Sequence, residues 1–279
     1  MTYQDFEVGG LAARRWGLGQ PCLALHGWMD NAATWDRLAP LLPGLELVAL
    51  DLPGHGRSPH RPAEAFYHFI DWIPAVLAVT QELGWTRYHL LGHSMGAGIA
   101  SLVAGAVPAQ IDRLLLVEGL GPFTSPETEA PALLRRSLSH RLSGRRPVYA
   151  DREAAVVRLE NRGLSRAGAE ALAGRAVVEV EGGVAFSYDP RLRTPSRARL
   201  TEGQIRAFLA EITAPTLLVL GRQGLEIPDQ MLGQRARLVP DLKVVKVEGG
   251  HHLHLDRPEA VAPVMRDFLD LGLARGGRG

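Results

Sequence analysis

The sequence predicts an α/β fold with a mostly parallel sheet, and two observations carry that prediction. Short apolar segments recur along the chain, and longer segments with helical spacing of apolar residues lie between them. Glycines and polar residues follow most of the short segments, as they do at the carboxyl ends of strands in open parallel sheets. The chain has 279 residues, which is long enough to bury a core of this kind.

The composition is that of an ordinary globular protein. Hydrophobic residues make up 46% and charged residues 22%, values that exclude disordered, collagen-like and coiled-coil chains. The formal net charge is +1, so no global charge favours nucleic acid or an anionic membrane as a partner. The single cysteine, Cys22, excludes an intrachain disulfide and a multi-cysteine zinc site. Because the acidic N-terminus also lacks the pattern of a secretory signal, we expect a cytoplasmic protein.

The apolar pattern predicts six strands and five helices in alternation. The strands are residues 22–25, 47–50, 88–91, 114–117, 216–220 and 243–247. The helices are residues 33–42, 69–83, 95–107, 228–238 and 258–273, the last beginning with proline, whose missing N–H costs little there. Residues 88–111 carry no formal charge and could span a bilayer by length, but their glycines and Pro108 indicate a buried core instead.

One long interval interrupts the alternation. Residues 121–211 have helical periodicity and many arginines, with no strong signal for a parallel strand. We therefore predict a core domain of residues 1–120 and 212–279, and a helical cap or lid of residues 121–211. Residues 131–200 hold 14 Arg against 7 acidic residues, an excess that would attract anionic substrates if it faced a pocket. Arginine is nearly the only basic residue type of the chain, so solvated helix faces are the preferred interpretation.

The strongest chemical signal is the segment Gly92-His93-Ser94-Met95-Gly96. It follows an apolar strand and begins a helix of small residues, which is the setting of a nucleophile elbow. Side chains at the two glycine positions would collide with the strand or the helix of so tight a turn. Ser94 is thus the predicted nucleophile, and a glycine-rich turn with an incidental serine is the alternative.

A serine nucleophile needs a base, and the histidines after the last predicted strand are candidates. His251 follows two glycines at a point where a turn can aim its imidazole at the elbow. His252 and His254 compete with it by spacing. Together with Asp256 these histidines also suggest a metal site, but such spacings arise readily by chance, and we predict no metal.

The acid that orients the base has two candidates. Glu118 ends the strand 114–117, and Glu226 follows the strand 216–220. An ionised carboxylate just past a buried strand is unfavourable unless it is paired, so Glu118 is more readily a site residue than a packing residue. A solvated loop position is its alternative.

The oxyanion of an acyl-transfer reaction needs two backbone N–H donors. One is expected from Met95, directly after the serine. The other is expected from Trp28, because His26-Gly27-Trp28 follows the first predicted strand and Gly27 lets the backbone approach closely. The residues that we expect to contact substrate are His26, Gly27, His93 and Phe123.

Motifs along nearly the whole chain resemble the α/β-hydrolase superfamily. They are His26-Gly27-Trp28-Met29-Asp30-Asn31, Asp51-Leu52-Pro53-Gly54-His55-Gly56-Arg57-Ser58, the elbow at residues 92–96, and Gly250-His251. The segments HGWMDNAATW and VEGLGP resemble, within that superfamily, the serine hydrolase-like proteins. The resemblance implies an eight-stranded, mostly parallel sheet flanked by helices, a helical cap inserted after strand 6, no cofactor, and hydrolysis through a Ser-His-acid triad. The segment 51–58 is interpreted as a structural turn, in which Asp51 accepts backbone N–H groups.

The resemblance also bears on the base and the acid. The histidine of the superfamily matches His251. The common acid position lies three residues after Gly221, where this chain has Gly224 and therefore no side chain. Some members, including dehalogenase-like and serine hydrolase-like ones, carry the acid where this chain has Glu118, so Glu118 is preferred and Glu226 is the alternative.

The sequence therefore predicts a serine hydrolase that cleaves a carboxylic ester or similar small acyl substrate through an acyl-enzyme. Carbon–carbon bond hydrolysis or lactone opening would use the same triad. A non-catalytic receptor or scaffold is a further alternative, because Gly224 removes the usual acid. Haloalkane dehalogenases and epoxide hydrolases are disfavoured, since they carry aspartate where this chain has Ser94. The expected partner is a small molecule, not nucleic acid or a membrane, and the sequence makes no prediction of the oligomeric state.

Overall fold

The computed structural model describes residues 2–140 and 146–271. An eight-stranded sheet lies at its centre, with the strand order β1-β2-β4-β3-β5-β6-β9-β10. Neighbours from β4 to β10 are parallel, whereas β2 is antiparallel to both β1 and β4, so the sheet is mostly parallel as predicted. The strands are β1 (Tyr3–Val8), β2 (Leu11–Trp16), β3 (Gln20–Leu25), β4 (Leu45–Leu50), β5 (Tyr88–His93), β6 (Ile111–Val117), β9 (Thr216–Gln223) and β10 (Leu242–Gly250).

All six predicted strands are present, and the two strands of this sheet that the apolar pattern missed are β1 and β2. Both are antiparallel and lie at one edge of the sheet. The side chain of Arg14 in β2 is buried, and its guanidinium bonds Asp5 at 2.8 Å and Asp36 at 2.7 Å. A charged residue in a strand of this kind interrupts the apolar run that identifies fully buried strands.

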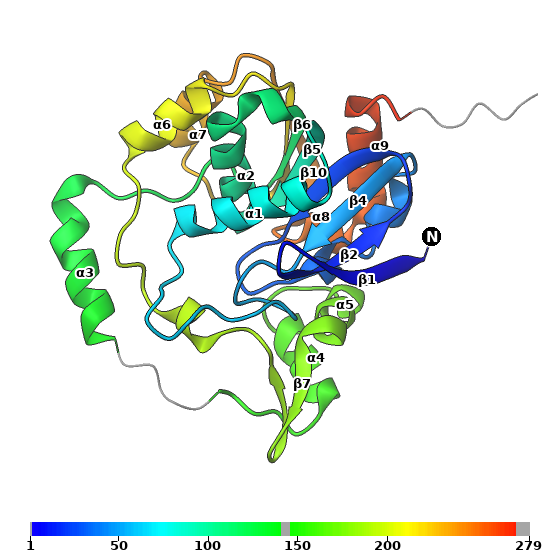
Figure 1. Cartoon of the computed structure of the whole chain (residues 1–279), viewed down its shortest axis with the longest axis vertical. Coiled ribbons are helices and arrows are strands. Elements are labelled where there is room, and N and C mark those ends of the chain that lie inside the picture. The colour runs from blue at the N-terminus through cyan, green and yellow to red at the C-terminus, as the bar shows by residue number, and fades with distance from the viewer. Residues whose placement is uncertain (1, 141–145, 272–279) are drawn as a thin grey trace, which may run out of the picture.

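Alternate side chains of the central strands point into two separate apolar cores. Leu23 and Leu25 of β3 face the core that contains α1 (Trp72–Glu82), α2 (Met95–Ala106) and α6 (Glu202–Ala210), against which α7 (Asp229–Ala236) also packs. Cys22 and Ala24 face the opposite core, which contains the 3₁₀ turn η1 (Ala32–Trp35), α8 (Leu253–Asp256) and α9 (Pro258–Phe268). Figure 1 shows α1 and α2 on one side of the strands and α9 on the other. The sheet is therefore covered by helices on both faces.

The predicted helices are found, with one correction. Residues 33–42 form two short 3₁₀ turns, η1 and η2 (Ala39–Leu41); Asn31 caps the first turn, and Pro40 is the second residue of the other. The helix predicted at 69–83 begins with a 3₁₀ turn, η3 (Phe69–Asp71), and continues as α1. The helix predicted at 258–273 is α9, which ends at Phe268, and residues 272 and 273 of that prediction lie outside the described residues. Nowhere in residues 2–140 and 146–271 is a helix both long and apolar enough to cross a bilayer, and residues 88–111 are β5, α2 and the turn η4 (Pro108–Gln110).

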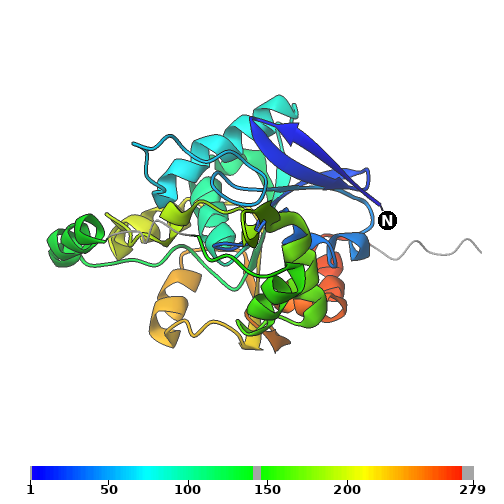
Figure 2. The same cartoon turned by 90° about the horizontal axis from the view of Figure 1, so that it is seen from below.

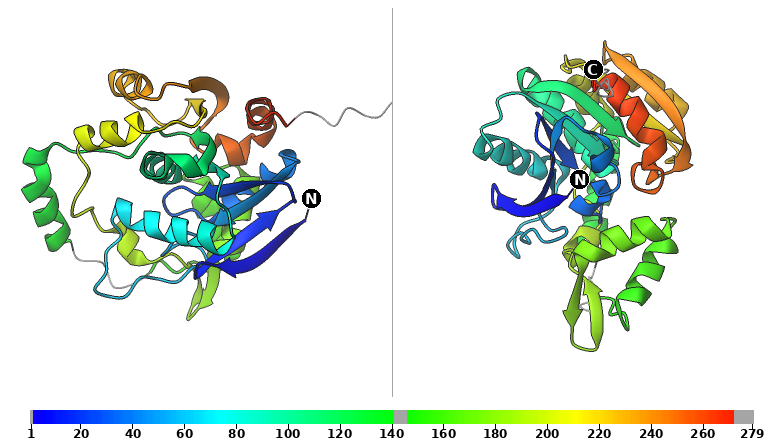
Figure 3. Two further views of the ribbon diagram at one scale, coloured as in Figure 1. Left: turned by 45° about the horizontal axis from the view of Figure 1, so that its top comes forward. Right: turned by 90° about the vertical axis from the view of Figure 1, so that its right-hand side faces the viewer.

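The interval between β6 and β9 holds four helices and a small antiparallel hairpin among its described residues. The 3₁₀ turn η5 (Glu127–Glu129) precedes α3, and η6 (Pro190–Arg193) precedes α6. Figure 3 shows α4, α5 and the hairpin as a lobe beside the sheet, and Figure 2 shows α3 projecting from the opposite side of the molecule. The elements are α3 (Ala130–Ser139), α4 (Arg152–Glu160), α5 (Arg166–Ala176), β7 (Val177–Val180) and β8 (Gly183–Phe186).

Buried polar contacts join this lobe to the sheet domain. Arg175 in α5 bonds Asp51 at 2.9 Å, and both side chains are almost fully buried. Asp51 also accepts the backbone N–H groups of Ala32 at 2.7 Å and Arg57 at 2.8 Å, which confirms the structural role predicted for the segment 51–58. Asn31 donates through its amide to the carbonyl oxygen of Leu172 at 3.0 Å. The lobe is thus anchored next to the loop that follows β3.

Candidate active site

Ser94 lies at the tip of the turn between β5 and α2. Its backbone has φ 52° and ψ −110°, a conformation that is strained for any residue with a side chain. A Cβ on Gly92 would lie 2.4 Å from the carbonyl oxygen of Gly96, and a Cβ on Gly96 would lie 2.3 Å from the carbonyl oxygen of Leu25. Both glycines are therefore required by the tightness of the turn, as the elbow pattern predicts.

His251 reaches Ser94 from the segment that follows β10. Its Nε2 lies 3.0 Å from Ser94 Oγ, and its Nδ1 lies 3.1 Å from Glu118 Oε2. An ionised carboxylate only accepts hydrogen bonds, so Nδ1–H donates to Glu118 and leaves Nε2 to accept the proton of the serine hydroxyl. The side chain of His251 is 31% exposed, so part of the ring remains accessible from outside.

Glu118 follows β6 and is only 1% exposed. Its Oε1 accepts the backbone N–H of Gly221 at 2.6 Å, and its Oε2 accepts that of Leu225 at 2.5 Å in addition to the bond from His251. Three donors compensate the burial of the carboxylate without a lysine or arginine. Glu118 also has a positive φ of 59°, so backbone strain accompanies this position as it does Ser94.

Glu226, the alternative acid, lies elsewhere. It is exposed and lines a surface cavity of about 440 Å³ together with Asp229 and Lys246. Among the described residues no hydrogen bond or ion pair joins Glu226 to His251. The structure thus brings Ser94, His251 and Glu118 together and leaves Glu226 apart.

The two backbone N–H groups predicted for an oxyanion hole belong to Trp28 and Met95. No hydrogen bond within residues 2–140 and 146–271 uses either N–H. Met95 is the first residue of α2, so its N–H is one of those that a helix leaves unpaired. The indole of Trp28 is 47% exposed and donates through Nε1 to the carbonyl oxygen of Leu192 at 3.2 Å, so this residue also touches the segment between β6 and β9.

Two of the four residues expected to contact substrate are buried in supporting positions, which corrects that expectation for their side chains. His26 is fully buried; its Nδ1 donates to the carbonyl oxygen of Gly27, and its Nε2 accepts the N–H of Leu52 at 3.0 Å. His93 is fully buried as well, and its Nε2 donates to the carbonyl oxygen of His251 at 2.9 Å. Polar residues next to the elbow therefore hold loops in place here.

The other two expected contacts differ in exposure. Gly27 is buried, and its carbonyl oxygen accepts the N–H of Asp30 at 3.2 Å in a turn. Phe123 is 59% exposed and follows Gly119, at which a Cβ would lie 3.2 Å from the carbonyl oxygen of Ser94. Phe123 is thus a few residues from a segment that packs directly on the elbow.

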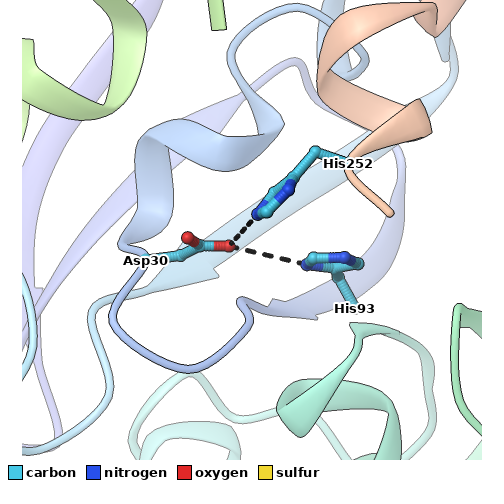
Figure 4. A group of neighbouring side chains, drawn as sticks. All are labelled: Asp30, His93 and His252. Carbon is cyan, nitrogen blue, oxygen red and sulfur yellow. Dashed lines mark ion pairs between the residues drawn. The ribbon is translucent and has the colours of Figure 1, made fainter. Parts of the chain in front are cut away.

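The remaining histidines of the sequence cluster lie close to one another but make different polar contacts. His254 Nε2 and Thr34 Oγ1 share a hydrogen bond of 2.8 Å, and Asp256 accepts the hydroxyl of Ser165 at 2.5 Å. His252 instead pairs with Asp30 at 3.4 Å, as Figure 4 shows. No local sequence signal places Asp30 next to His252, because the two residues are far apart in the chain.

The electrostatics of this region follow from burial and from the Asp30 carboxylate. Burial lowers the pKa of His93 to about 4 despite the nearby Asp30. Burial also disfavours a charged His252, but the ion pair with Asp30 outweighs it and raises the pKa of His252. In turn, His252 and His93 hold the pKa of Asp30 well below its usual range against the effect of burial. Asp30 is therefore an ionised, buried carboxylate beside the Ser94–His251 pair.

Comparisons with known proteins agree on one family. The alpha/beta hydrolase fold family matches residues 21–155. The chain is 34% identical to a serine hydrolase-like protein of Danio rerio over 278 residues, covering 94% of this chain and 85% of that protein. A hypothetical protein of Pseudomonas aeruginosa PAO1, solved by crystallography, superimposes with a TM-score of 0.90 at 41% identity, covering 97% of this chain and 100% of the other.

A thioesterase domain from the curacin biosynthetic pathway superimposes with a TM-score of 0.82 at 30% identity, over 95% of this chain and 99% of that one. The relatives thus include proteins named as serine hydrolase-like and a neighbour named as a thioesterase. These matches extend over nearly the whole chain, well beyond the elbow itself. The chain therefore belongs to the α/β-hydrolase family, among the serine hydrolase-like proteins.

Proposed function

We propose that this protein is a serine hydrolase that cleaves a carboxylic ester or a similar small acyl compound, thioesters included. The observation that carries the proposal is the chain of contacts from Ser94 Oγ through His251 to Glu118, at 3.0 Å and 3.1 Å. Each group holds the hydrogen-bonding role that acyl transfer requires of it. The thioesterase neighbour supports the acyl class of substrate.

The first half of the reaction forms an acyl-enzyme. Ser94 Oγ attacks the substrate carbonyl carbon while its proton passes to His251 Nε2. Glu118 accepts Nδ1–H and stabilises the imidazolium that results. The N–H groups of Trp28 and Met95 bind the oxyanion, and the proton on Nε2 then passes to the leaving alcohol or thiol.

The second half hydrolyses the acyl-enzyme. A water molecule replaces the leaving group and gives a proton to His251 as it attacks the acyl carbon. Collapse of the second oxyanion releases the acid and returns the proton to Ser94. The strained backbone of Ser94 is consistent with this role, because such conformations concentrate at functional sites.

Residues 121–211 are assigned as the cap, and the remainder of the chain as the catalytic domain. Trp28 supports this assignment, because its indole reaches the carbonyl oxygen of Leu192 in that segment. Phe123 is proposed as a substrate contact, since its exposed ring follows the segment that packs on the elbow. The arginines of the segment are more simply structural than substrate-attracting, because Arg175 pairs with Asp51 and Arg191 pairs with Asp189. The single, buried Cys22 agrees with a reducing cytoplasm, where we place the protein.

The contacts also favour catalysis over a receptor or scaffold role. The argument for a receptor was the glycine at the usual acid position, and Glu118 supplies a carboxylate there. The alternatives that use the same triad, carbon–carbon bond hydrolysis and lactone opening, differ from ester cleavage only in the substrate.

A panel of p-nitrophenyl esters of increasing acyl length tests the proposal. The wild-type protein should turn over one or more of these esters, with an optimum that reports pocket depth. The Ser94→Ala variant should be folded by circular dichroism and inactive. Wild-type turnover in that variant would remove the proposed mechanism. If no ester of the panel reacts, lactones and vinylogous diketones test the same triad on its alternative substrates.

A further inference from the structure

A buried group of donor atoms lies behind the proposed catalytic histidine. Asp30 Oδ2 lies 3.5 Å from His93 Nδ1 and 3.4 Å from His252 Nε2 (Figure 4). One donor atom from each of the three residues falls within 4.8 Å of the other two. The three residues come from the loop after β3, the end of β5 and the segment after β10, and none of them belongs to the proposed triad.

The hydrogen bond of His93 decides which of its ring nitrogens carries the proton. Nε2 lies 2.9 Å from the carbonyl oxygen of His251, and a carbonyl oxygen can only accept, so Nε2 is protonated. In a neutral ring Nδ1 then presents a lone pair, and it faces a carboxylate oxygen that presents lone pairs of its own. Within the described residues neither His93 Nδ1 nor Asp30 Oδ2 has a hydrogen-bond partner. His252 offsets the charge of Asp30 from 3.4 Å away but puts no donor between Asp30 Oδ2 and His93 Nδ1, so these two buried lone pairs still repel one another. A positive charge between them removes the repulsion.

We propose that Asp30, His93 and His252 form a binding site for a divalent transition-metal ion of the Zn²⁺ class. Neighbouring ligands of a tetrahedral ion bound at about 2.1 Å lie about 3.4 Å apart. The two separations that Asp30 makes, 3.4 Å and 3.5 Å, match that spacing. Two imidazoles and one carboxylate are a donor set that such ions accept, with a fourth position left for water.

The surroundings of His93 support the same assignment. Histidines that bind a metal through one ring nitrogen usually donate the other N–H to a carboxylate or a backbone carbonyl. His93 does so through Nε2 to the carbonyl oxygen of His251. A Cβ on Gly27 would lie 2.9 Å from both Asp30 Oδ2 and His93 Nδ1, so a glycine at this position leaves the two donor atoms uncovered on that side.

This inference goes beyond the proposed function and departs from the sequence-based prediction of no metal. That prediction weighed His251, His252, His254 and Asp256, of which only His252 belongs to the group. An ion at this site would join the loop of Trp28, the elbow of Ser94 and the segment of His251 through one set of bonds. It would do so without occupying Ser94 or His251, so metal binding and hydrolysis are separable by mutation.

Isothermal titration of the purified full chain with Zn²⁺ tests the site. The wild-type protein should bind one ion, and Asp30→Asn and His252→Gln should each weaken binding by at least about 100-fold, more than the loss of a supporting contact. Two histidine controls should keep the wild-type affinity: His251→Gln beside the site, and His140→Gln at an exposed position. If His251→Gln abolishes binding while His252→Gln retains it, the ion binds at the catalytic histidine and the proposal is wrong.

A second measurement does not depend on the variants folding. Crystals of the wild-type protein soaked in Zn²⁺ should give an anomalous difference peak within bonding distance of Asp30 Oδ2, His93 Nδ1 and His252 Nε2. Co²⁺ in solution should give the intense visible absorption of a tetrahedral site. Absence of the peak, or a peak on His251 alone, would contradict the proposed metal site. Because neither readout requires turnover, failure here leaves the proposed hydrolase activity untouched.

Discussion

The carboxylate of Glu118 lies where a side chain of residue 224 would begin. A Cβ on Gly224 would be 2.3 Å from both Oε1 and Oε2 of Glu118. The two residues follow β6 and β9, which are parallel neighbours whose carboxyl ends meet at the same edge of the sheet. An acid can therefore reach one place beside His251 from either strand, and in this chain Glu118 occupies it.

The first prediction compares the two candidate acids. Glu118→Gln should lower kcat/KM for an ester by roughly 10³- to 10⁴-fold, because the neutral amide neither fixes the tautomer nor stabilises the imidazolium of His251. Glu226→Gln is the matched control and should leave kcat/KM within about twofold, since its side chain is exposed and has no hydrogen bond or ion pair to His251 among the described residues. The reverse ranking would reassign the acid.

The second prediction moves the acid from one strand to the other. Glu118→Gly alone should be nearly inactive, and the residue should tolerate glycine because its φ is 59°. Adding Gly224→Asp should recover activity by at least about tenfold, because the new carboxylate starts from the place that Glu118 vacates. Gly224→Asp on its own should destabilise the protein by collision with Glu118. A folded double variant no more active than Glu118→Gly would show that residue 224 cannot supply the acid.

The third prediction concerns the buried ion pair of Arg175 and Asp51. Arg175→Met should lower the free energy of unfolding by about 3–5 kcal/mol, because it leaves Asp51 buried without its counter-charge. For a chain of this size that corresponds to a Tm lower by roughly 6–20 °C. Arg166 lies on the same helix as Arg175, but its ion pair with Glu153 is exposed. Arg166→Met should therefore change Tm by no more than about 2 °C. Equal effects of the two variants in differential scanning calorimetry would contradict the importance given to burial.

The fourth prediction is a loss of stability in mild acid. Burial lowers the pKa of His55 to about 3, whereas an unfolded histidine titrates near 6.5. Below pH 6.5 the unfolded chain binds a proton that the folded chain excludes, so stability falls as the pH drops from 6.5 towards 3. Each such histidine contributes a slope that approaches about 1.4 kcal/mol per pH unit.

Urea unfolding between pH 7.5 and pH 4.5 measures that slope. His55→Leu should reduce it by about 1.4 kcal/mol per pH unit, whatever its effect on stability at neutral pH. His140→Gln, at an exposed position, should leave the slope unchanged. An unaltered slope in His55→Leu would mean that the buried ring is already protonated in the folded protein.

The strands could be predicted from the sequence where burial makes a segment of the chain apolar. Most of the parallel strands are continuous apolar runs because helices cover both faces of the sheet, and each such run is a strand in the structure. The exception is the edge strand β10, which is more exposed and carries Lys243 and Lys246. The apolar pattern missed β2 because Arg14 places a charge inside the strand and pairs it with Asp5 and Asp36. It missed β1 because most residues of that strand are exposed and form no apolar run. Two 3₁₀ turns occupy the place of one predicted helix, and Pro40 lies in the second of them.

The site was predictable in its motifs but not in its packing. The elbow glycines follow from local turn geometry, whereas spacing left His251, His252 and His254 open and the resemblance to the α/β-hydrolase superfamily favoured His251. His26 and His93 are polar, yet their supporting roles depend on backbone groups of Leu52 and His251 that only the folded chain brings near. The meeting of Asp30 with His252 is of the same kind, because it depends on tertiary structure between distant residues.

The most direct test of the central claim is covalent labelling of the serine. A fluorophosphonate reagent should form one adduct per chain, and peptide mass spectrometry should place it on Ser94. His251→Gln should slow labelling by several orders of magnitude, and Ser94→Ala should abolish it. No adduct on the folded wild-type protein, or an adduct on another residue, would contradict the assignment of Ser94 as the nucleophile.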